Sequence, residues 1–219
     1  MKLKPVNIAQ TASASSIVFD ALRKAIIEGD LSDGEALRQD EIAKLFNTSR
    51  IPVREAISRL EEQGLVKTVR YKGAVVSALS DNDLAEIFDF RAVIEPEIMR
   101  RAVPNLTDED VAAARKFCDL FAQSSDTTQW GGFNRAFHAA LYGPSNLPFH
   151  LEVAENAMDR VDRFLRHRML TDNRKATSDT EHHAILVACE NRDAERAAKL
   201  TRNHILGTKV HLLRKVPQD

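Results

Sequence analysis

All seven histidines lie after residue 137, and three of them lie in three different segments with helical patterns. Asn134 and His138 are four residues apart, so on a helix they share one face. His182 and His204 belong to two later segments with helical patterns. Three imidazoles and one side-chain oxygen are a workable ligand set for Zn²⁺, Ni²⁺ or Mn²⁺. The residues alone leave two alternatives open, a shared site or histidines that are separately hydrogen-bonded or exposed.

A second chemically capable set lies near residue 50. Apolar residues there recur at i, i+3, i+4 and i+7 and predict the buried face of a helix: Val53, Ala56, Ile57 and Leu60. Arg50 and Arg54 lie on another face of this helix, where guanidinium groups can bind a guanine edge or a phosphate. A solvated face paired with nearby glutamates is the alternative.

The elements around these arginines are predicted to be three helices and a hairpin. The first helix begins at Ser15 or Ser16 and ends at Gly29, and the next two cover about 39–46 and 49–63. Two short strands follow at 65–69 and 74–76. This order predicts a winged helix-turn-helix.

From Ser80 onward the apolar period is helical throughout. The six predicted helices cover about 81–103, 108–123, 129–142, 148–170, 178–190 and 193–213. Thr107 and Asp110 form a predicted capping box at the second of them. The fold class is therefore mainly α, with an N-terminal winged helix-turn-helix and a C-terminal all-α bundle. The predicted domains are 15–78 and 80–213, flanked by tails at 1–14 and 214–219.

Composition excludes several classes of protein. With 219 residues, 43% hydrophobic and 29% charged, the chain is neither disordered nor collagen-like. The net charge is −1, yet residues 1–78 carry 12 Lys and Arg against 10 Asp and Glu, a small basic excess. No apolar run is long enough for a membrane helix and no signal peptide is visible, so we expect a cytoplasmic protein. Cys118 and Cys189 predict two reduced, buried thiols.

Residues from about 15 to 78 resemble the DNA-binding domain of GntR-type bacterial transcriptional regulators, above all in the sequence SRIPVREAISRLEEQGLV at 49–66 and in Lys72, Gly73 and Ala74. The resemblance implies DNA contacts from the recognition helix and from the tip of the wing. The implied residues are Arg38, Arg50, Arg54, Lys72 and Gly73. Many members have an arginine where this chain has Asp40, so either Arg38 replaces that contact or the contact is lost.

Residues 80–213 resemble the FCD effector domain of the FadR subfamily. The matching segments are 91–95, 134–138, 181–186 and 204–205. Many such domains hold a metal through an Asp or Asn four residues before a His, followed by two further His. The resemblance thus implies a divalent metal, zinc first and nickel or manganese next, at Asn134, His138, His182 and His204. Six helices rather than seven indicate the VanR-like branch.

A metal with neutral ligands keeps its full charge and favours an anion in its open positions. Arg91 could bind a second oxygen of that anion, or could instead pair with Glu95 at i+4. Members of the FCD subfamily commonly bind small organic acids, which agrees with this electrostatic argument.

The sequence thus predicts a homodimeric, ligand-responsive transcription factor that represses a metabolic operon. We expect the protein to be associated with the bacterial nucleoid. It would bind an inverted repeat in double-stranded DNA and a small carboxylate effector. One alternative is a metal-free dimer whose bundle senses a different or larger acyl ligand. A metal-dependent hydrolase tethered to DNA is disfavoured, because the HExxH motif is absent and no carboxylate is spaced as a general base beside the ligands. We therefore predict that the protein is not an enzyme.

Overall fold

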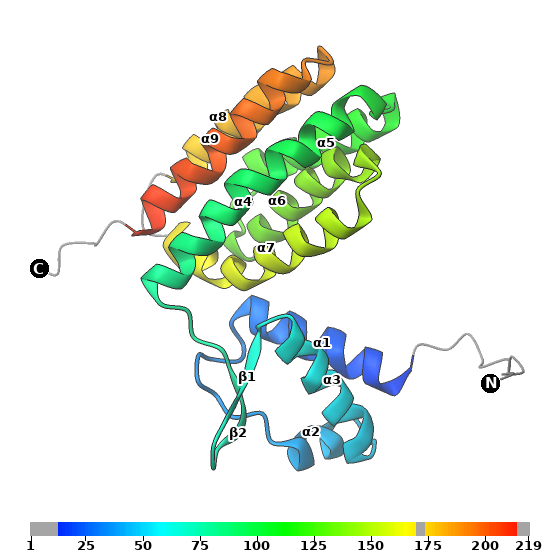
Figure 1. Cartoon of the computed structure of the whole chain (residues 1–219), viewed down its shortest axis with the longest axis vertical. Helices are drawn as coiled ribbons and strands as arrows, with labels where there is room; N and C mark the ends of the chain where they lie inside the picture. The colour runs from blue at the N-terminus through cyan, green and yellow to red at the C-terminus, as the bar shows by residue number, and fades with distance from the viewer. Residues whose placement is uncertain (1–12, 170–173, 214–219) are drawn as a thin grey trace, which may run out of the picture. The chain divides into compact units, whose positions relative to one another are not determined.

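A computed structural model describes residues 13–169 and 174–213 (Figure 1). The chain divides into two compact units, with the boundary between Ala78 and Leu79. Each unit has its own buried apolar core, so each is described by itself.

The first unit contains α1 (Ala14–Glu28), α2 (Gln39–Leu45) and α3 (Arg50–Glu62). Ser13 caps α1, because its side chain accepts a hydrogen bond from the Ser16 amide. The predicted cap at Ser15 or Ser16 is therefore wrong: both residues lie inside the first turn. Gly29 ends α1 with a φ of 85°, as predicted. The cation of Arg59 stacks 3.9 Å above the Phe19 ring and joins α3 to α1.

The hairpin pairs β1 (Val66–Val69) with β2 (Gly73–Val76) in antiparallel register, Val66 opposite Val76. The outer edge of β2 is also covered. The Leu37 amide donates to the Ala74 carbonyl over 2.8 Å, and the Val76 amide donates to the Glu35 carbonyl over 2.9 Å. The segment before α2 thereby fixes the hairpin against the three helices, as a winged helix-turn-helix requires.

The described part of the second unit contains six α-helices and two short 3-10 turns (Figure 1). The helices are α4 (Asp81–Ala102), α5 (Asp108–Gln123), α6 (Thr127–Tyr142), α7 (Pro148–Met169), α8 (Arg174–Glu190) and α9 (Ala194–Leu213). The capping box predicted at Thr107 and Asp110 is present, with hydrogen bonds of 2.8 Å and 3.1 Å between each side chain and the other residue's amide. α4 packs along α9, and α5 packs against α6 and α8.

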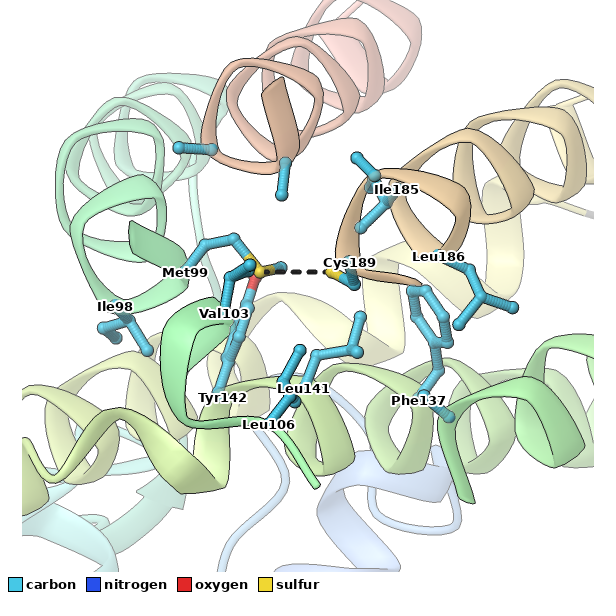
Figure 2. Packing of buried hydrophobic residues seen from close by; sticks show 14 of the residues in the cluster. Ile98, Met99, Val103, Leu106, Phe137, Leu141, Tyr142, Ile185, Leu186 and Cys189 are labelled. Carbon is cyan, nitrogen blue, oxygen red and sulfur yellow. Dashed lines mark hydrogen bonds between the residues drawn. The ribbon is translucent and has the colours of Figure 1, made fainter. Parts of the chain in front are cut away.

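The main core of this unit contains side chains from α4 to α9, together with Val103 and Leu106, and Figure 2 labels those of α4, α6 and α8 around these two residues. Phe137, Leu141 and Cys189 are fully buried in it. The Cys189 sulfur lies 3.8 Å from the Met99 sulfur, which is the dashed contact in Figure 2. Both cysteines are buried free thiols, which confirms that prediction.

The mainly α fold with a small two-stranded wing is confirmed. In the described residues, no helix has both the length and the apolar character that crossing a membrane requires.

Candidate functional sites

The structure brings three histidines from three helices of the second unit together. His138 lies on α6, His182 on α8 and His204 on α9, and one ring nitrogen of each lies within 4.8 Å of the others. Their ring centroids are 4.8–5.5 Å apart. All three are buried, with residue exposures of 1%, 0% and 7%. Phe121 and Phe137 pack on the His182 ring, with centroid distances of 5.0 Å and 4.7 Å, and form an apolar wall behind the cluster.

Hydrogen bonding and burial prepare these imidazoles to donate lone pairs. Nδ1 of His204 lies 2.7 Å from the Glu181 carboxylate, which fixes this ring and leaves Nε2 facing away from Glu181. Both ring nitrogens of His138 are buried without a hydrogen-bond partner among the described residues. Burial first, and then the positive potential of His204 and Arg91, lower the pKa of His138 well below its ordinary value. His138 is therefore neutral at pH 7, which is the form that binds metals.

A cavity beside this cluster is lined by side chains from five helices, with His204 in its wall. Its other polar or charged side chains are Arg91, Thr127, Asn134, Asp162, Ser178, Thr208 and His211. Asn134 is thus near His204 and one helical turn before His138. Phe88, Trp130 and Leu212 supply apolar parts of the wall. Such a mixture can bind a small molecule that carries several oxygen atoms.

Arg91 both lines the cavity and pairs with Glu95, so the two sequence alternatives for this residue coexist. Its Nε donates to one Glu95 oxygen over 2.6 Å and its Nη2 to the other over 3.4 Å. Tyr142 donates a third hydrogen bond to this carboxylate over 2.8 Å. Arg91 and Glu95 are 4% and 0% exposed. These two hydrogen bonds use Nε and Nη2, so Nη1 is the guanidinium nitrogen that they do not engage.

Two carboxylates beside the histidine cluster correct the expectation that none would lie there. Glu181 contacts His204, and Asp162 of α7 lines the cavity. Each is already bonded, Glu181 to an imidazole and Asp162 to the guanidinium of Arg135 on α6. They hold other side chains in place. No local pattern in the sequence points to Asp162, whereas Glu181 is adjacent to the predicted ligand His182.

The predicted DNA-contacting residues of the first unit are exposed on α3 and at the start of α2. Arg50 is the first residue of α3, and Arg54 lies one turn further on. Asp40 of α2 forms an ion pair with Arg50, so the residue that departs from the family pattern contacts a predicted DNA-binding arginine directly. Arg38 pairs with Glu41 over 3.1 Å.

The wing carries the other two predicted residues. Lys72 and Gly73 are exposed at the hairpin, and Gly73 has a φ of 74°. A non-glycine side chain would be strained in this left-handed conformation. Tyr71 beside them is 90% exposed and also has a positive φ, 66°. A large ring held at the tip of a hairpin in this way is available to a partner, and sequence reasoning gave Tyr71 no role.

A winged helix with an exposed arginine row, joined to a helical bundle with a cavity of mixed polar and apolar lining, defines the class of ligand-responsive DNA-binding regulators. The comparisons with known families agree. Residues 14–76 match "Bacterial regulatory proteins, gntR family" and residues 86–207 match "FCD domain". The chain belongs to the GntR family and carries an FCD domain, and it is a transcriptional regulator.

Two curated relatives illustrate this membership. The transcriptional repressor GlaR of Escherichia coli K12 is 29% identical over 198 residues, 84% of this chain and 89% of GlaR. The gluconate operon transcriptional repressor of Bacillus licheniformis is 26% identical over 90% of this chain and 84% of its own length. Among solved structures, E. coli McbR/YncC has the same fold, with a TM-score of 0.82 over 92% of this chain and 98% of that one, at 24% identity.

Proposed function

We propose that this regulator is a homodimeric, metal-containing repressor that senses a small organic acid. Residues 15–78 would bind operator DNA, and residues 80–213 would bind the effector and form the dimer. The observation that carries the proposal is the convergence of three buried imidazoles, His138, His182 and His204, beside a cavity that Arg91 also lines.

The residues present fit a divalent metal. The His138 nitrogens are buried, neutral and without hydrogen bonds to described residues, an arrangement whose burial cost a bound cation would offset. Asn134, one turn before His138 and in the cavity wall, is positioned to offer its amide oxygen. Three imidazoles and an amide favour zinc first, with nickel and manganese next. All of these donors are neutral, so the ion would supply a full double positive charge and open positions for a carboxylate.

The chain's own residues favour an oxygen-rich anion of small size. The Arg91 charge is balanced by Glu95, so Arg91 would orient an effector oxygen through Nη1 rather than supply net attraction. Ser178, Thr208 and Asn134 offer further polar groups to hydroxyl or carboxylate oxygens. The name of the Bacillus licheniformis relative supports this class, because gluconate is a small hydroxylated acid.

On DNA, two copies would each place α3 in a half-site of an inverted repeat. Arg50 and Arg54 would contact bases and phosphates there, Arg38 would contact the backbone, and Lys72 with Gly73 would enter the minor groove. Effector binding would release the repressor by shifting the population of DNA-competent dimers. The six helices in the described part of the effector unit support a place in the VanR-like branch. Because its target is chromosomal DNA, we place the protein in the bacterial cytoplasm, at the nucleoid.

The first test is the metal content of tag-free protein, wild type beside His138→Ala, by elemental mass spectrometry. We expect the variant to hold one metal ion per chain fewer than the wild type. A panel of small carboxylates would then be tested for release of the wild type from its operator. A metal-free wild type that cannot be loaded would refute the coordination proposal and leave DNA binding intact.

The same operator-release assay, extended to long-chain acyl compounds, distinguishes a large effector from a small acid. A long-chain acyl compound that releases the DNA while small acids do not would favour the acyl-sensing alternative. Hydrolysis of a carboxylic ester panel that depends on His138 would instead support a hydrolase.

A further inference from the structure

A second group of metal-binding side chains lies between α5 and α8, away from the three-histidine cluster. Cys118 of α5 faces Asp179 and His183 of α8, and one donor atom of each lies within 4.8 Å of the others. Asp179 and His183 are four residues apart and so share a helix face. Cys118 is fully buried, while the His183 side chain is 47% exposed, so the group lies at the protein surface with its sulfur inside.

We propose that Cys118, Asp179 and His183 form a second metal site, which takes a thiophilic divalent cation such as Zn²⁺, Co²⁺ or Cd²⁺. The consecutive residues His182 and His183 then serve two different sites, because neighbouring helix positions point about 100° apart.

The distances between donor atoms agree with tetrahedral coordination. The Cys118 sulfur lies 3.5 Å from Nδ1 of His183, and that nitrogen lies 3.4 Å from Oδ1 of Asp179. With usual zinc bond lengths and a tetrahedral angle, sulfur and nitrogen ligands are separated by about 3.5 Å, and nitrogen and oxygen ligands by about 3.4 Å. Two edges of the coordination polyhedron are thus present without movement of either helix.

Local contacts further support a cation. Oδ1 of Asp179 is buried and has no hydrogen-bond partner among the described residues. Asp119 lies 3.9 Å from Nε2 of His183, on the side of the ring away from the sulfur, where a carboxylate orients a metal-bound histidine. Nδ1 of His183 lies 3.1 Å from the Asp179 backbone carbonyl, a contact that coordination would replace.

The thiol is unsuited to act as a nucleophile or redox sensor on its own. Burial first, and then the negative charges of Asp179 and Asp119, raise the pKa of Cys118 to about 12. A thiol in this state is protonated and inert at neutral pH. A divalent cation would reverse the effect of the two carboxylates and bind the sulfur as thiolate, with release of its proton to water.

Cobalt distinguishes this site from the histidine cluster. Full-length, metal-free protein is titrated with Co²⁺, and the thiolate-to-cobalt charge-transfer band in the near ultraviolet is followed. We expect this band in the wild type and in His138→Ala, and its loss in Cys118→Ser and His183→Ala. Cys189→Ser is the matched control, because it removes the other buried thiol and should leave the band unchanged.

Equilibrium dialysis gives the second readout. We expect two Co²⁺ per wild-type chain, and one in His138→Ala or His183→Ala. His183 is half exposed, so its variant tests the site even if Cys118→Ser fails to fold. Absence of the band at saturating Co²⁺ in the wild type, or its persistence in a folded Cys118→Ser or His183→Ala protein, would overturn the proposal.

Discussion

The buried ion pair between Arg91 and Glu95 gives the sharpest prediction for stability. The Glu95 carboxylate accepts two hydrogen bonds from Arg91 and one from Tyr142, and none of these residues is more than 4% exposed. Glu95→Gln removes the negative charge and leaves the Arg91 charge buried and uncompensated. Breaking a buried pair in this way costs about 3–5 kcal/mol.

The consequence for thermal unfolding follows from the size of the unit. For a domain of this size, a loss of that magnitude lowers the midpoint by roughly 10–15 °C. The chain has a single tryptophan, Trp130, and it lies on α6 of the second unit. Its fluorescence therefore reports the unfolding of this unit and is insensitive to the winged helix. Measurements at one protein concentration hold the concentration dependence of dimerisation equal among the variants, and excess chelator removes the contribution of a bound metal.

Glu97→Gln is a matched control. Glu97 lies on the same helix and also pairs with two arginines, Arg100 and Arg101, but its side chain is 40% exposed. Exposed pairs of this kind contribute about 0–1 kcal/mol. In the double variant Arg91→Met with Glu95→Gln, both charges are gone, so much of the loss should be recovered. Two results would refute this reasoning. One is a loss of unfolding free energy below about 1 kcal/mol in Glu95→Gln. The other is a loss in the double variant that equals the sum of the losses in Arg91→Met and Glu95→Gln.

Four further outcomes follow from single contacts. Arg54→Ala should weaken operator binding by about 1–3 kcal/mol in a gel-shift titration at fixed salt, and unchanged affinity would remove this residue from the interface. Asp40→Asn should tighten binding to scrambled DNA and reduce the preference for operator, measured by fluorescence anisotropy, because it removes a negative charge and frees Arg50; a parallel change on both DNAs would contradict this. Glu181→Gln should weaken metal binding at the histidine cluster by about 10–100-fold in a competition titration with a chelator, because His204 loses its charged partner; an unchanged affinity would count against that role. Burial and the Glu95 charge raise the pKa of Tyr142 well above its ordinary value, so at high pH the folded protein keeps a proton that the unfolded chain loses. The free energy of unfolding should therefore fall above about pH 10. In denaturant titrations, Tyr142→Phe should lack this pH dependence.

Local patterns were sufficient to predict the winged helix and the helix order of the bundle. Each of these patterns is local, because it spans only a few residues. The structure agrees with the helical period, with the helix end at Gly29 and with the capping box at Thr107 and Asp110. The first cap was misplaced because three serines occur at residues 13, 15 and 16, and each could cap a helix. Ser13 is the cap because it is the serine with an extended backbone, at ψ 149°, directly before the first helical residue.

The sites depended on tertiary contacts that no spacing reveals. The helical period puts Asn134 and His138 on one face, but it cannot place the histidines of α8 and α9 beside them. Glu181 contacts His204, 23 residues away, and Asp162 contacts Arg135, 27 residues away. The i+4 pair of Arg91 and Glu95 was visible, yet only the packing shows that this pair is buried and that Arg91 lines a cavity.

The covalent path from the cavity to the winged helix is short and largely held in place. Arg91 lies on α4, ten residues after the start of the helix at Asp81, or about 15 Å along its axis. Ser80 caps α4 through Asp83, and the Ser77 amide donates to the Leu65 carbonyl in the first unit. Only two residues separate these fixed points. The same helix, α4, therefore carries a residue of the cavity wall, Arg91, and begins two residues after the boundary between the two units at Ala78 and Leu79.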